Sequence, residues 1–362
     1  MTIEEKVREL SSSPASKEDE EILKFIEESK PRVFVIGAGG SGTNTVDRLF
    51  ELGVEGVNLI GLNTDARHLL RIRANRKILI GKQLTRGRGA GSNPEVGASA
   101  AKESMEEIKE AIKDANMVFV TCGLGGGTGT GSAPIIAEEA KKMGALTIAV
   151  VTLPFNSEGR VRMENALAGL EALRKTTDTL IVIRNNKLLT IAPDLPLNTA
   201  FKVCDEVLAG SVKGIAELIT KSGLVNVDFA DLRTILSTAG YAVIGLGEAS
   251  VDAKGEERSA IAIETALNSP LLDADISGAS RALINVIGGE DMTLKEAELI
   301  VSETTKRIHP GAHVIWGSRI EPDMQKASIK VLVVLGGVKF PKYSVESESA
   351  SPSEEIDLDV IG

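Results

Sequence analysis

Residues 122–132 (CGLGGGTGTGS) could bind phosphate, because this stretch combines six glycines with three hydroxyl side chains. Glycine lacks a Cβ atom, so its backbone can approach an anion closely and turn N–H groups toward it. The stretch follows an apolar run at 117–121 and precedes a helical pattern at 133–140, in which Pro134 would occupy the first turn. A helix N-terminus adds a favourable dipole, whereas a flexible linker rarely lies between a strand and a helix. The stretch therefore predicts a phosphate-binding loop.

A second glycine-rich stretch, 37–44 (GAGGSGTN), fits the dinucleotide pattern GxGxxG through Gly37, Gly39 and Gly42. A dinucleotide site also requires an acidic residue about 20 positions further on to hold the ribose, and Asp65 is available. An NAD-dependent Rossmann oxidoreductase with Asp65 on the ribose is therefore an alternative function.

Two glycine loops favour a nucleoside triphosphate, since a dinucleotide has one pyrophosphate and a triphosphate needs a longer cradle. A third turn-rich segment, 87–97 (GRGAGSNPEVG), could close over the γ-phosphate, and Arg86 and Arg88 could contact phosphate there. The sequence contains no GxxxxGK[ST] stretch, so the protein is not a P-loop NTPase.

Asp228 and Asp231 could act on a water molecule, because their i,i+3 spacing at an expected helix N-terminus presents both carboxylates on one face. Asn226 lies beside them. Two carboxylates can orient and polarise water for attack and help to hold a cation. The structural alternative is a helix cap whose acids favour the dipole, and both roles are compatible. The nucleotide-binding half offers no evident base, so we expect the second half to supply this function.

Alternating strands and helices must position these residues. Apolar runs separated by helical patterns predict a parallel sheet covered by helices on both faces, and thus an α/β fold. These runs are 33–36, 57–62, 77–80, 117–121, 146–152 and 179–183. A long helical pattern at 199–220 predicts a connecting helix, and a second α/β domain follows it. Its strand candidates are 241–245, 281–287, 312–316 and 329–335, with helices near 256–268 and 293–307.

The predicted organisation has five parts. They are an N-terminal helical extension (1–31), a nucleotide-binding domain (32–198), a connecting helix (199–222), a second α/β domain (223–338) and a tail (339–362). From residue 344 the composition turns to Ser, Glu and Pro, which is typical of disorder. The apolar-acidic end at 356–361 (IDLDVI) predicts a short binding motif, with an ordinary frayed end as the alternative.

Composition excludes several classes of protein. A net charge of −10 gives no electrostatic footprint for nucleic acid. No stretch approaches the roughly 20 apolar residues that span a bilayer, so we expect a cytoplasmic protein that reaches a membrane only through a partner. Cys122 and Cys204 match no metal or redox spacing, and we expect two small buried residues.

The run 125–131 (GGGTGTG) resembles the phosphate-loop signature of the tubulin family, in the form found in FtsZ, its prokaryotic cell-division GTPases. The resemblance extends from about Arg32 to Val338. Its matching stretches are 37–44, 63–65, 93–97, 152–155 and 226–231. It implies a Rossmann-like GTP-binding domain, a connecting helix and a C-terminal GTPase-activating domain. The tail looks closer to archaeal members than to bacterial ones.

The resemblance also implies a role for single residues in binding GTP or GDP with Mg²⁺, an ion held mainly by phosphates. Asp205 would select guanine, because a carboxylate can accept from both N1–H and N2–H, a donor pair that adenine lacks. The remaining implied nucleotide contacts are Gly39, Gly40 and Asn44 with phosphates and base, Gly125, Gly126, Gly127, Thr128, Gly129 and Thr130 around the phosphates, Glu158 on the ribose, Arg162 over ribose or phosphates, and Asn185 and Phe201 on the base.

In the resembled family, the segment 226–231 enters the nucleotide site of the next subunit. The resemblance therefore implies a head-to-tail polymer at the mid-cell division site, with a membrane adaptor reading the tail. This sequence departs from the usual family pattern at Ser157, where Phe is common, and at 184–186 (RNN), where Pro-Asn-Asp is common. A non-catalytic paralogue that binds GTP is a third possibility, and the presence of Asp228 and Asp231 counts against it.

Overall fold

The computed structural model describes Phe25 and residues 30–339, except 192–195, 222, 250–255, 322–323 and 325–327. The predicted helix near the N-terminus lies outside the described residues except for Phe25, and the tail beyond Lys339 lies outside them entirely.

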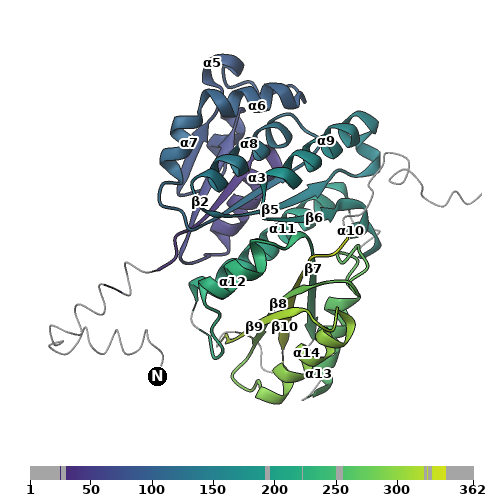
Figure 1. Cartoon of the computed structure of the whole chain (residues 1–362). Helices are drawn as coiled ribbons and strands as arrows, with labels where there is room; N and C mark the ends of the chain where they lie inside the picture. The colour runs from purple at the N-terminus through teal and green to yellow at the C-terminus, as the bar shows by residue number, and fades with distance from the viewer. Residues whose placement is uncertain are drawn as a thin grey trace, which may run out of the picture.

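The described strands form one sheet that runs through both halves of the molecule, in the order β3-β2-β1-β4-β5-β6-β7-β10-β8-β9 (Figure 1). The strands from β3 to β7 are parallel to their neighbours, and β10 is antiparallel to both β7 and β8. The strands are β1 (Val33–Ala38), β2 (Val57–Asn63), β3 (Arg76–Leu79), β4 (Met117–Gly123), β5 (Leu146–Leu153), β6 (Thr179–Arg184), β7 (Gly240–Ala249), β8 (Arg281–Gly288), β9 (His313–Ile320) and β10 (Ile329–Gly336). The predicted α/β fold with a mostly parallel sheet is confirmed.

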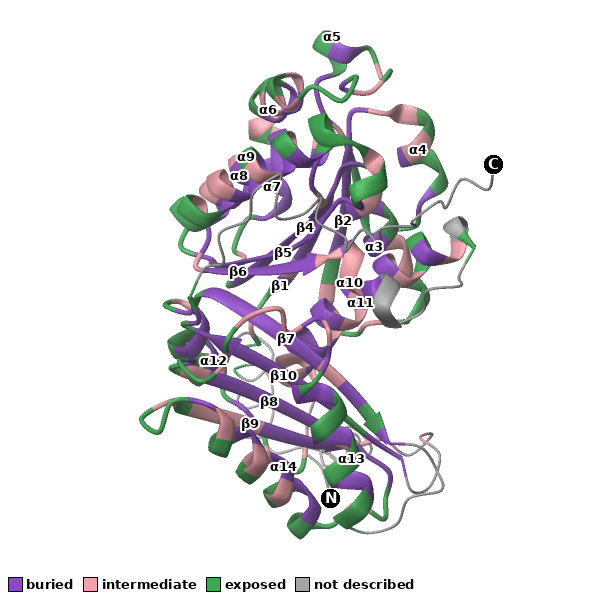
Figure 2. Ribbon diagram, turned by 90° about the vertical axis from the view of Figure 1, so that its right-hand side faces the viewer, coloured by how far each residue is buried: buried purple, intermediate pink, exposed green. Residues whose placement is uncertain are grey.

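Helices cover both faces of this sheet, and each face has its own buried apolar cluster. One cluster draws on α6, α7, α8, α9, α13 and α14, and the other on α3, α4, α10, α11 and α12. Figure 2 shows that the central strands between these layers are mostly buried, whereas the edge strands β3 and β9 are partly exposed. The helices are α3 (Gly39–Glu51), α4 (Ala66–Arg71), α5 (Lys82–Thr85), α6 (Pro94–Glu103), α7 (Met105–Ala111), α8 (Thr128–Lys142), the 3-10 turn η1 (Asn156–Glu158), α9 (Arg160–Thr176), α10 (Asn185–Ile191), α11 (Leu197–Thr220), α12 (Phe229–Leu236), α13 (Glu256–Leu267) and α14 (Leu294–Arg307).

Helix α8 begins five residues earlier than the sequence predicted, at Thr128, so Pro134 lies inside the helix and not in its first turn. Two positions in this helix, 129 and 131, are glycine because other backbone segments pass too close to leave room for a Cβ atom. A Cβ atom added at Gly131 would lie 1.9 Å from the carbonyl oxygen of Pro94, and one added at Gly129 would lie 2.9 Å from that of Ala38. The glycine-rich sequence therefore reflects close packing as well as a loop.

Helix α11 packs on the sheet and runs from the carboxyl ends of the parallel strands, called here their carboxyl edge, to their amino ends, the amino edge. Its 24 residues give a length of about 36 Å. Near its start, Asp205 faces the first turn of α3, which follows β1. Near its end, Thr220 packs against Gly56, which precedes β2: a Cβ atom at Gly56 would lie 2.8 Å from the Thr220 Cβ. The helix thus joins the carboxyl edge of the parallel strands to their amino edge.

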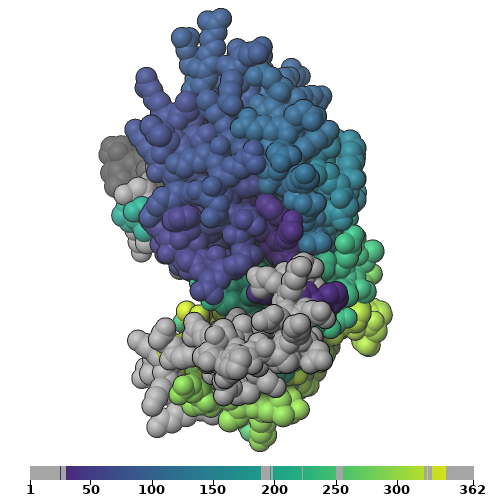
Figure 3. Space-filling model, turned by 90° about the vertical axis from the view of Figure 1, so that its left-hand side faces the viewer, coloured from purple at the N-terminus to yellow at the C-terminus, as the bar shows by residue number. Residues whose placement is uncertain are grey.

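The second half of the chain contributes β7 to β10 with α12, α13 and α14. Figure 3 shows this half, in green, below the purple and blue first half. Cys122 and Cys204 are free and buried, as expected, and burial raises the pKa of each thiol to about 12. None of the helices in the described ranges is long and apolar enough to cross a membrane.

Candidate active site

The two predicted phosphate loops meet at the carboxyl edge of the sheet. One connects β1 to α3, the other connects β4 to α8, and β1 and β4 are adjacent parallel strands at which the strand order reverses. Open α/β sheets bind ligands in the crevice at such a reversal. The loops touch, since a Cβ atom at Gly39 would lie 2.7 Å from the Gly129 nitrogen. In the described part of the chain neither α3 nor α8 has a side-chain cap, so their first N–H groups are available to an anion.

Gly126 and Gly40 are the glycines of these loops that face outward. A Cβ atom at Gly126 would meet no described atom within 4 Å, and Gly40 is exposed. The other glycines are enclosed. A Cβ atom at Gly125, whose φ is +104°, would lie 2.8 Å from the Arg162 carbonyl oxygen, and one at Gly127 would lie 2.8 Å from an Ala90 carbon atom. Phosphate can therefore approach the loop backbone most closely at Gly126 and Gly40.

The hydroxyl residues of the β4–α8 loop brace it internally. The Gly125 N–H donates to Thr130 Oγ1 at 2.9 Å, and Thr130 is buried. Thr128 Oγ1 lies 2.6 Å from Thr64 Oγ1 in the β2–α4 connection. Thr130 and Thr128 thus brace the β4–α8 loop through contacts within the chain.

Asp65 acts as the N-cap of α4. Its Oδ1 accepts from the backbone N–H groups of Arg67 at 2.8 Å and of His68 at 3.1 Å. This oxygen is committed to the helix, as a capping carboxylate should be. The arrangement gives no support to the alternative in which Asp65 holds a dinucleotide ribose.

Asp205 is half-buried on α11 and faces the start of α3. Its Oδ1 lies 3.4 Å from Ser41 Oγ, and its Oδ2 lies 3.4 Å from Asn44 Nδ2. Burial raises the pKa of Asp205 to about 6, and these two hydrogen bonds oppose the rise. Two long hydrogen bonds leave carboxylate lone pairs for the N–H groups of a base.

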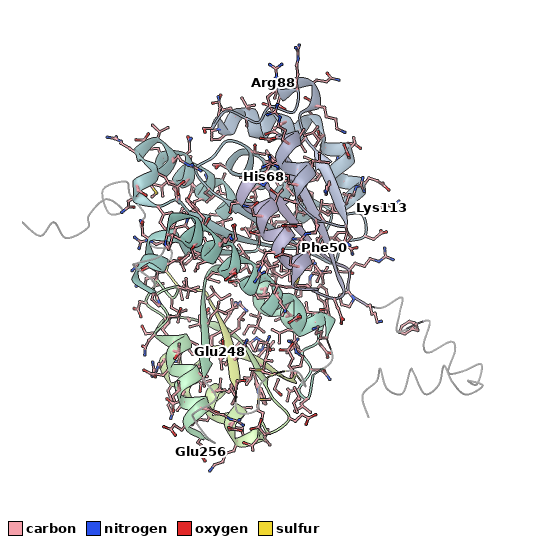
Figure 4. All side chains as sticks on the ribbon, turned by 180° about the vertical axis from the view of Figure 1, so that it is seen from behind. Phe50, His68, Arg88, Lys113, Glu248 and Glu256 are labelled. Carbon is pink, nitrogen blue, oxygen red and sulfur yellow. The ribbon has the colours of Figure 1, made fainter. Side chains whose placement is uncertain are left out.

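His68 is a neighbour of this site that the sequence analysis missed. Its Nε2 lies 2.9 Å from Asn44 Oδ1. Because the Asp205 carboxylate accepts hydrogen bonds, Asn44 turns its Nδ2 toward Asp205 and its Oδ1 toward His68. Figure 4 shows His68 in the upper half of the molecule, below Arg88. A lone histidine on a short helix gives no motif, so sequence reasoning had no signal for it.

Phe201 lies one turn before Asp205 on α11, and Asn185 follows β6 at the start of α10. Phe201 packs edge-to-face on Phe155, with ring centroids 5.3 Å apart, and it stays 40% exposed. Asn185 begins α10, and its buried Oδ1 has no hydrogen-bond partner among the described residues. An exposed aromatic ring and an unpartnered buried oxygen both fit a base that stacks and donates.

Glu158 and Arg162 form an ion pair next to the phosphate loop. Glu158 Oε2 lies 3.0 Å from Arg162 Nη1, and Glu158 Oε1 accepts from the Phe155 N–H at 2.8 Å. The Arg162 carbonyl oxygen is the atom that encloses Gly125. Ser157, a departure from the family pattern, is exposed and leaves this pair undisturbed.

The second departure, at Arg184 and Asn186, ties the start of α10 to its surroundings. Arg184 pairs with Asp273, and Lys187 Nζ lies 2.9 Å from the same carboxylate. Burial favours neutral Asp273, but hydrogen bonds from these two cations lower its pKa below the usual value. Asn186 hydrogen-bonds Asn156. Asn185 thus lies between Arg184, which is tied to the second half of the chain, and Asn186, which is tied to η1.

The third turn-rich segment packs against the phosphate loop. A Cβ atom at Gly97 would lie 2.2 Å from the Gly127 carbonyl oxygen, and Asn93 caps α6 through the Glu95 N–H at 2.9 Å. Arg86 and Arg88 are exposed on this segment.

Asn226, Asp228 and Asp231 lie at the other edge of the sheet. All three are exposed, and Asp228 precedes α12 as its N-cap residue. Arg233 on α12 donates, at 3.2 Å, to the carbonyl oxygen of Gly144. Gly144 lies just before β5. The segment is separated from the nucleotide loops by the part of α11 beyond Asp205, about 22 Å of helix. These carboxylates therefore cannot reach the phosphate loops of their own chain.

Across the residues that the structure describes, no three His, Cys, Asp or Glu side chains gather into a group that could hold a metal ion. The donor set of the phosphate loops consists of backbone N–H groups and hydroxyls, which suits phosphate oxygens.

Comparison with known proteins agrees with this geometry. Residues 32–193 match the model of the Tubulin/FtsZ family GTPase domain, and residues 240–339 match that of the FtsZ family C-terminal domain. The chain is 54% identical over 334 residues to cell division protein FtsZ 1 of Methanocaldococcus jannaschii, covering 92% of this chain and 90% of the relative. It is 55% identical over 342 residues to the protein of that name from Pyrococcus abyssi, covering 94% and 90%.

Solved structures show the same likeness. An FtsZ dimer without ligand from M. jannaschii superposes with a TM-score of 0.84 at 55% identity, covering 89% of this chain and 92% of that one. GDP-bound CetZ1 from Haloferax volcanii shares the fold, with a TM-score of 0.74 at 24% identity and coverage of 85% and 94%. The chain thus belongs to the tubulin/FtsZ family, with the guanine nucleotide-binding GTPase domain and the C-terminal domain of its FtsZ branch.

Proposed function

We propose that this protein is a self-assembling GTPase of cell division, whose active site is completed by a second copy of the chain. The observation that carries the proposal is the separation along α11: Asp205 lies at the nucleotide edge of the sheet, and Asp228 and Asp231 lie exposed at the opposite edge. A carboxylate pair that cannot serve its own chain can serve a neighbour stacked on it.

The relatives support self-association and a role in division. The M. jannaschii structure is described as a dimer, and the curated relatives are named cell division proteins. A contact between the nucleotide edge of one copy and the opposite edge of the next is heterologous, so repetition gives a filament and not a closed ring of fixed size. The polymer would assemble at mid-cell.

The nucleotide is proposed to lie along the carboxyl edge. Gly40, Gly126 and Thr128 would contact the phosphates, Glu158 would accept from the ribose hydroxyls once its pairing with Arg162 adjusts, and Asp205 would accept from guanine N1–H and N2–H. Mg²⁺, a hard cation, would bridge phosphate oxygens and offset their charge.

Hydrolysis is proposed to use the segment 226–231 of the neighbouring copy. Asp228 and Asp231 would orient a water molecule toward the γ-phosphate, and Asn226 would fix the loop by accepting from the Gly223 N–H, which lies 2.7 Å away. Loss of the γ-phosphate would then remove contacts at the interface and limit filament lifetime.

The tail is proposed to bind a membrane adaptor through 356–361, where acidic and apolar residues alternate. Two other functions receive less support. A dinucleotide oxidoreductase would need Asp65, which caps α4, and a non-catalytic paralogue would not need the exposed Asp228 and Asp231.

Replacement of Asp231 by Ala tests this proposal. GTP affinity should stay within about twofold, since the residue is remote from the nucleotide edge, while turnover falls by about 100-fold or more and filaments persist longer. GTP binding, phosphate release and light scattering measure these three effects. Glu257→Ala, which removes an exposed acid from the first turn of α13, is the matched control. Equal losses of binding and turnover in Asp231→Ala would contradict a role in the next subunit.

A further inference from the structure

A buried ion pair joins the end of α11 to β9. Glu217 lies in the last turn of α11 and is 2% exposed, and Arg319 on β9 is 9% exposed. Arg319 Nη2 donates to Glu217 Oε2 at 3.0 Å, and Lys221 Nζ lies 3.1 Å from Glu217 Oε1. Lys213, one turn earlier on α11, lies 4.0 Å from the same oxygen. Buried charges of this kind are costly to separate, so the pair fixes the helix end on the strand.

The strand residue next to Arg319 holds the segment that carries the proposed catalytic residues. Ser318 forms a two-way backbone bridge to Val225: the Val225 N–H donates to Ser318 O at 3.2 Å, and the Ser318 N–H donates to Val225 O at 3.1 Å. Leu224 N–H also donates to Ser318 O, at 2.8 Å. The backbone just before Asn226 is therefore attached to β9.

Asn226 and the ion pair are immediate neighbours. Glu217, Arg319 and Asn226 line one small cavity of about 10 Å³ between α11, β9 and the segment. Close packing leaves the segment little freedom, because a Cβ atom at Gly223 would lie 2.4 Å from the Ser318 carbonyl oxygen. A shift of β9 relative to α11 would move the segment with it.

We infer that Glu217 and Arg319 are positioning residues for GTP hydrolysis: their ion pair locks β9 to α11 and so sets the position of Asn226, Asp228 and Asp231. The inference rests on the proposed active site shared between two copies. Neither residue of the pair touches nucleotide. Because Asp205 lies about 18 Å from Glu217 along α11, loss of the pair should disturb catalysis and leave nucleotide binding intact.

Replacement of Arg319 by Gln, and separately of Glu217 by Gln, tests the pair. At saturating GTP each variant should lose about tenfold or more in turnover, with KM for GTP and GTP affinity within about twofold. Arg319→Lys should recover most of the rate, since its ammonium group can still meet Glu217. Unchanged turnover in both Gln variants, or a raised KM with unchanged kcat, would overturn the inference.

The control for a general loss of stability is Arg258, which forms a comparable buried ion pair with Glu296 between α13 and α14. Arg258→Gln should lower the thermal midpoint as much as Arg319→Gln does and leave turnover per folded subunit near the parent value. If the two variants lose turnover equally at equal folded fraction, Arg319 has only a structural role.

Mixing variants shows which edge of the subunit Arg319 serves. Gly126→Asp places a carboxylate in the open space of the phosphate loop, so this copy binds no GTP but offers an intact 226–231 segment. An equal mixture of Arg319→Gln and Gly126→Asp should regain turnover, and a mixture of Arg319→Gln and Asp231→Ala should not.

A reference mixture separates the two claims. Asp231→Ala mixed with Gly126→Asp should regain turnover if two copies share the active site. Failure of this reference mixture would contradict the proposed function itself. Success of the reference with no recovery for Arg319→Gln and Gly126→Asp would overturn the positioning inference alone.

Discussion

Asp205, the proposed contact for the guanine base, is half-buried, and burial of its charged form opposes folding. Burial raises its pKa to about 6, so between about pH 4 and pH 6 the folded chain holds a proton that the unfolded chain releases. The free energy of unfolding is therefore highest when Asp205 is neutral, and this contribution is lost as the pH rises through about 6. At neutral pH the charged carboxylate, which we propose recognises guanine, therefore lowers the free energy of unfolding.

Asp205→Asn should therefore stabilise the nucleotide-free protein at pH 8 and weaken selection for guanine. The gain in free energy of unfolding should be on the order of 1–3 kcal/mol at pH 8 and should vanish near pH 4. Urea unfolding at the two pH values measures it. The control is Asp275→Asn, because hydrogen bonds from Ser277 lower the pKa of Asp275 and its neutral replacement should not stabilise at pH 8. A loss of stability in Asp205→Asn at pH 8 would contradict the assignment.

The phosphate-loop glycines should separate into two groups when replaced by Ala. Gly126→Ala should fold normally and weaken GTP binding, because its Cβ atom would project into open space at the loop. Gly131→Ala should lose about 3 kcal/mol or more of stability, because its Cβ atom would meet the Pro94 carbonyl oxygen at 1.9 Å. Thermal unfolding and nucleotide titration distinguish the two outcomes; normal stability in Gly131→Ala would contradict the packing of α6 on α8.

Sequence reasoning could not make this distinction at the residue scale. Glycine frequency alone marked the loop, but whether a glycine faces a ligand or a backbone depends on α6, which arrives from a distant part of the sequence. The same limit hid His68, whose partner Asn44 lies on another helix. The assigned nucleotide contacts and the 226–231 residues stay predictions.

At the scale of elements, α11 provides a matched pair of glycines. A Cβ atom at Gly210 would meet no described atom within 4 Å, whereas one at Gly214 would lie 2.3 Å from Leu332 Cδ1. Gly210→Ala should stabilise the protein by about 0.5–1 kcal/mol through helix propensity. Gly214→Ala should destabilise it by about 1–3 kcal/mol through overpacking.

Chemical denaturation of both α11 variants gives the comparison. The account requires changes of opposite sign in the free energy of unfolding, so destabilisation by both substitutions would show that the open space beside Gly210 does not accept a methyl group.

Most strands and the long connecting helix could be predicted from the sequence because their apolar runs and periodicities are local properties. Two features could not. The start of α8 was predicted too late, since glycines at 129 and 131 lower helix propensity while tight packing requires them. The antiparallel direction of β10 was not predicted either, because an apolar run has no direction until its partners are known.

At the scale of the whole molecule, the two halves share one sheet. β6 and β7 join them through three residue pairs, beginning with Thr179 and Gly240, and such a short junction leaves no trace in the sequence. The domain boundaries at 198 and 222 stay predictions. What the structure adds is polarity: nucleotide loops at one edge, exposed carboxylates at the other, and α11 between them.

Under the proposed function, this polarity makes assembly a condition for catalysis. The most direct measurement is GTP turnover per subunit as a function of protein concentration, with light scattering followed in the same samples in the presence of Mg²⁺. The account predicts that turnover and scattering rise together above a threshold concentration, because only then does a second copy complete the site. Turnover per subunit that is constant at all concentrations would place catalysis within one chain and contradict the account.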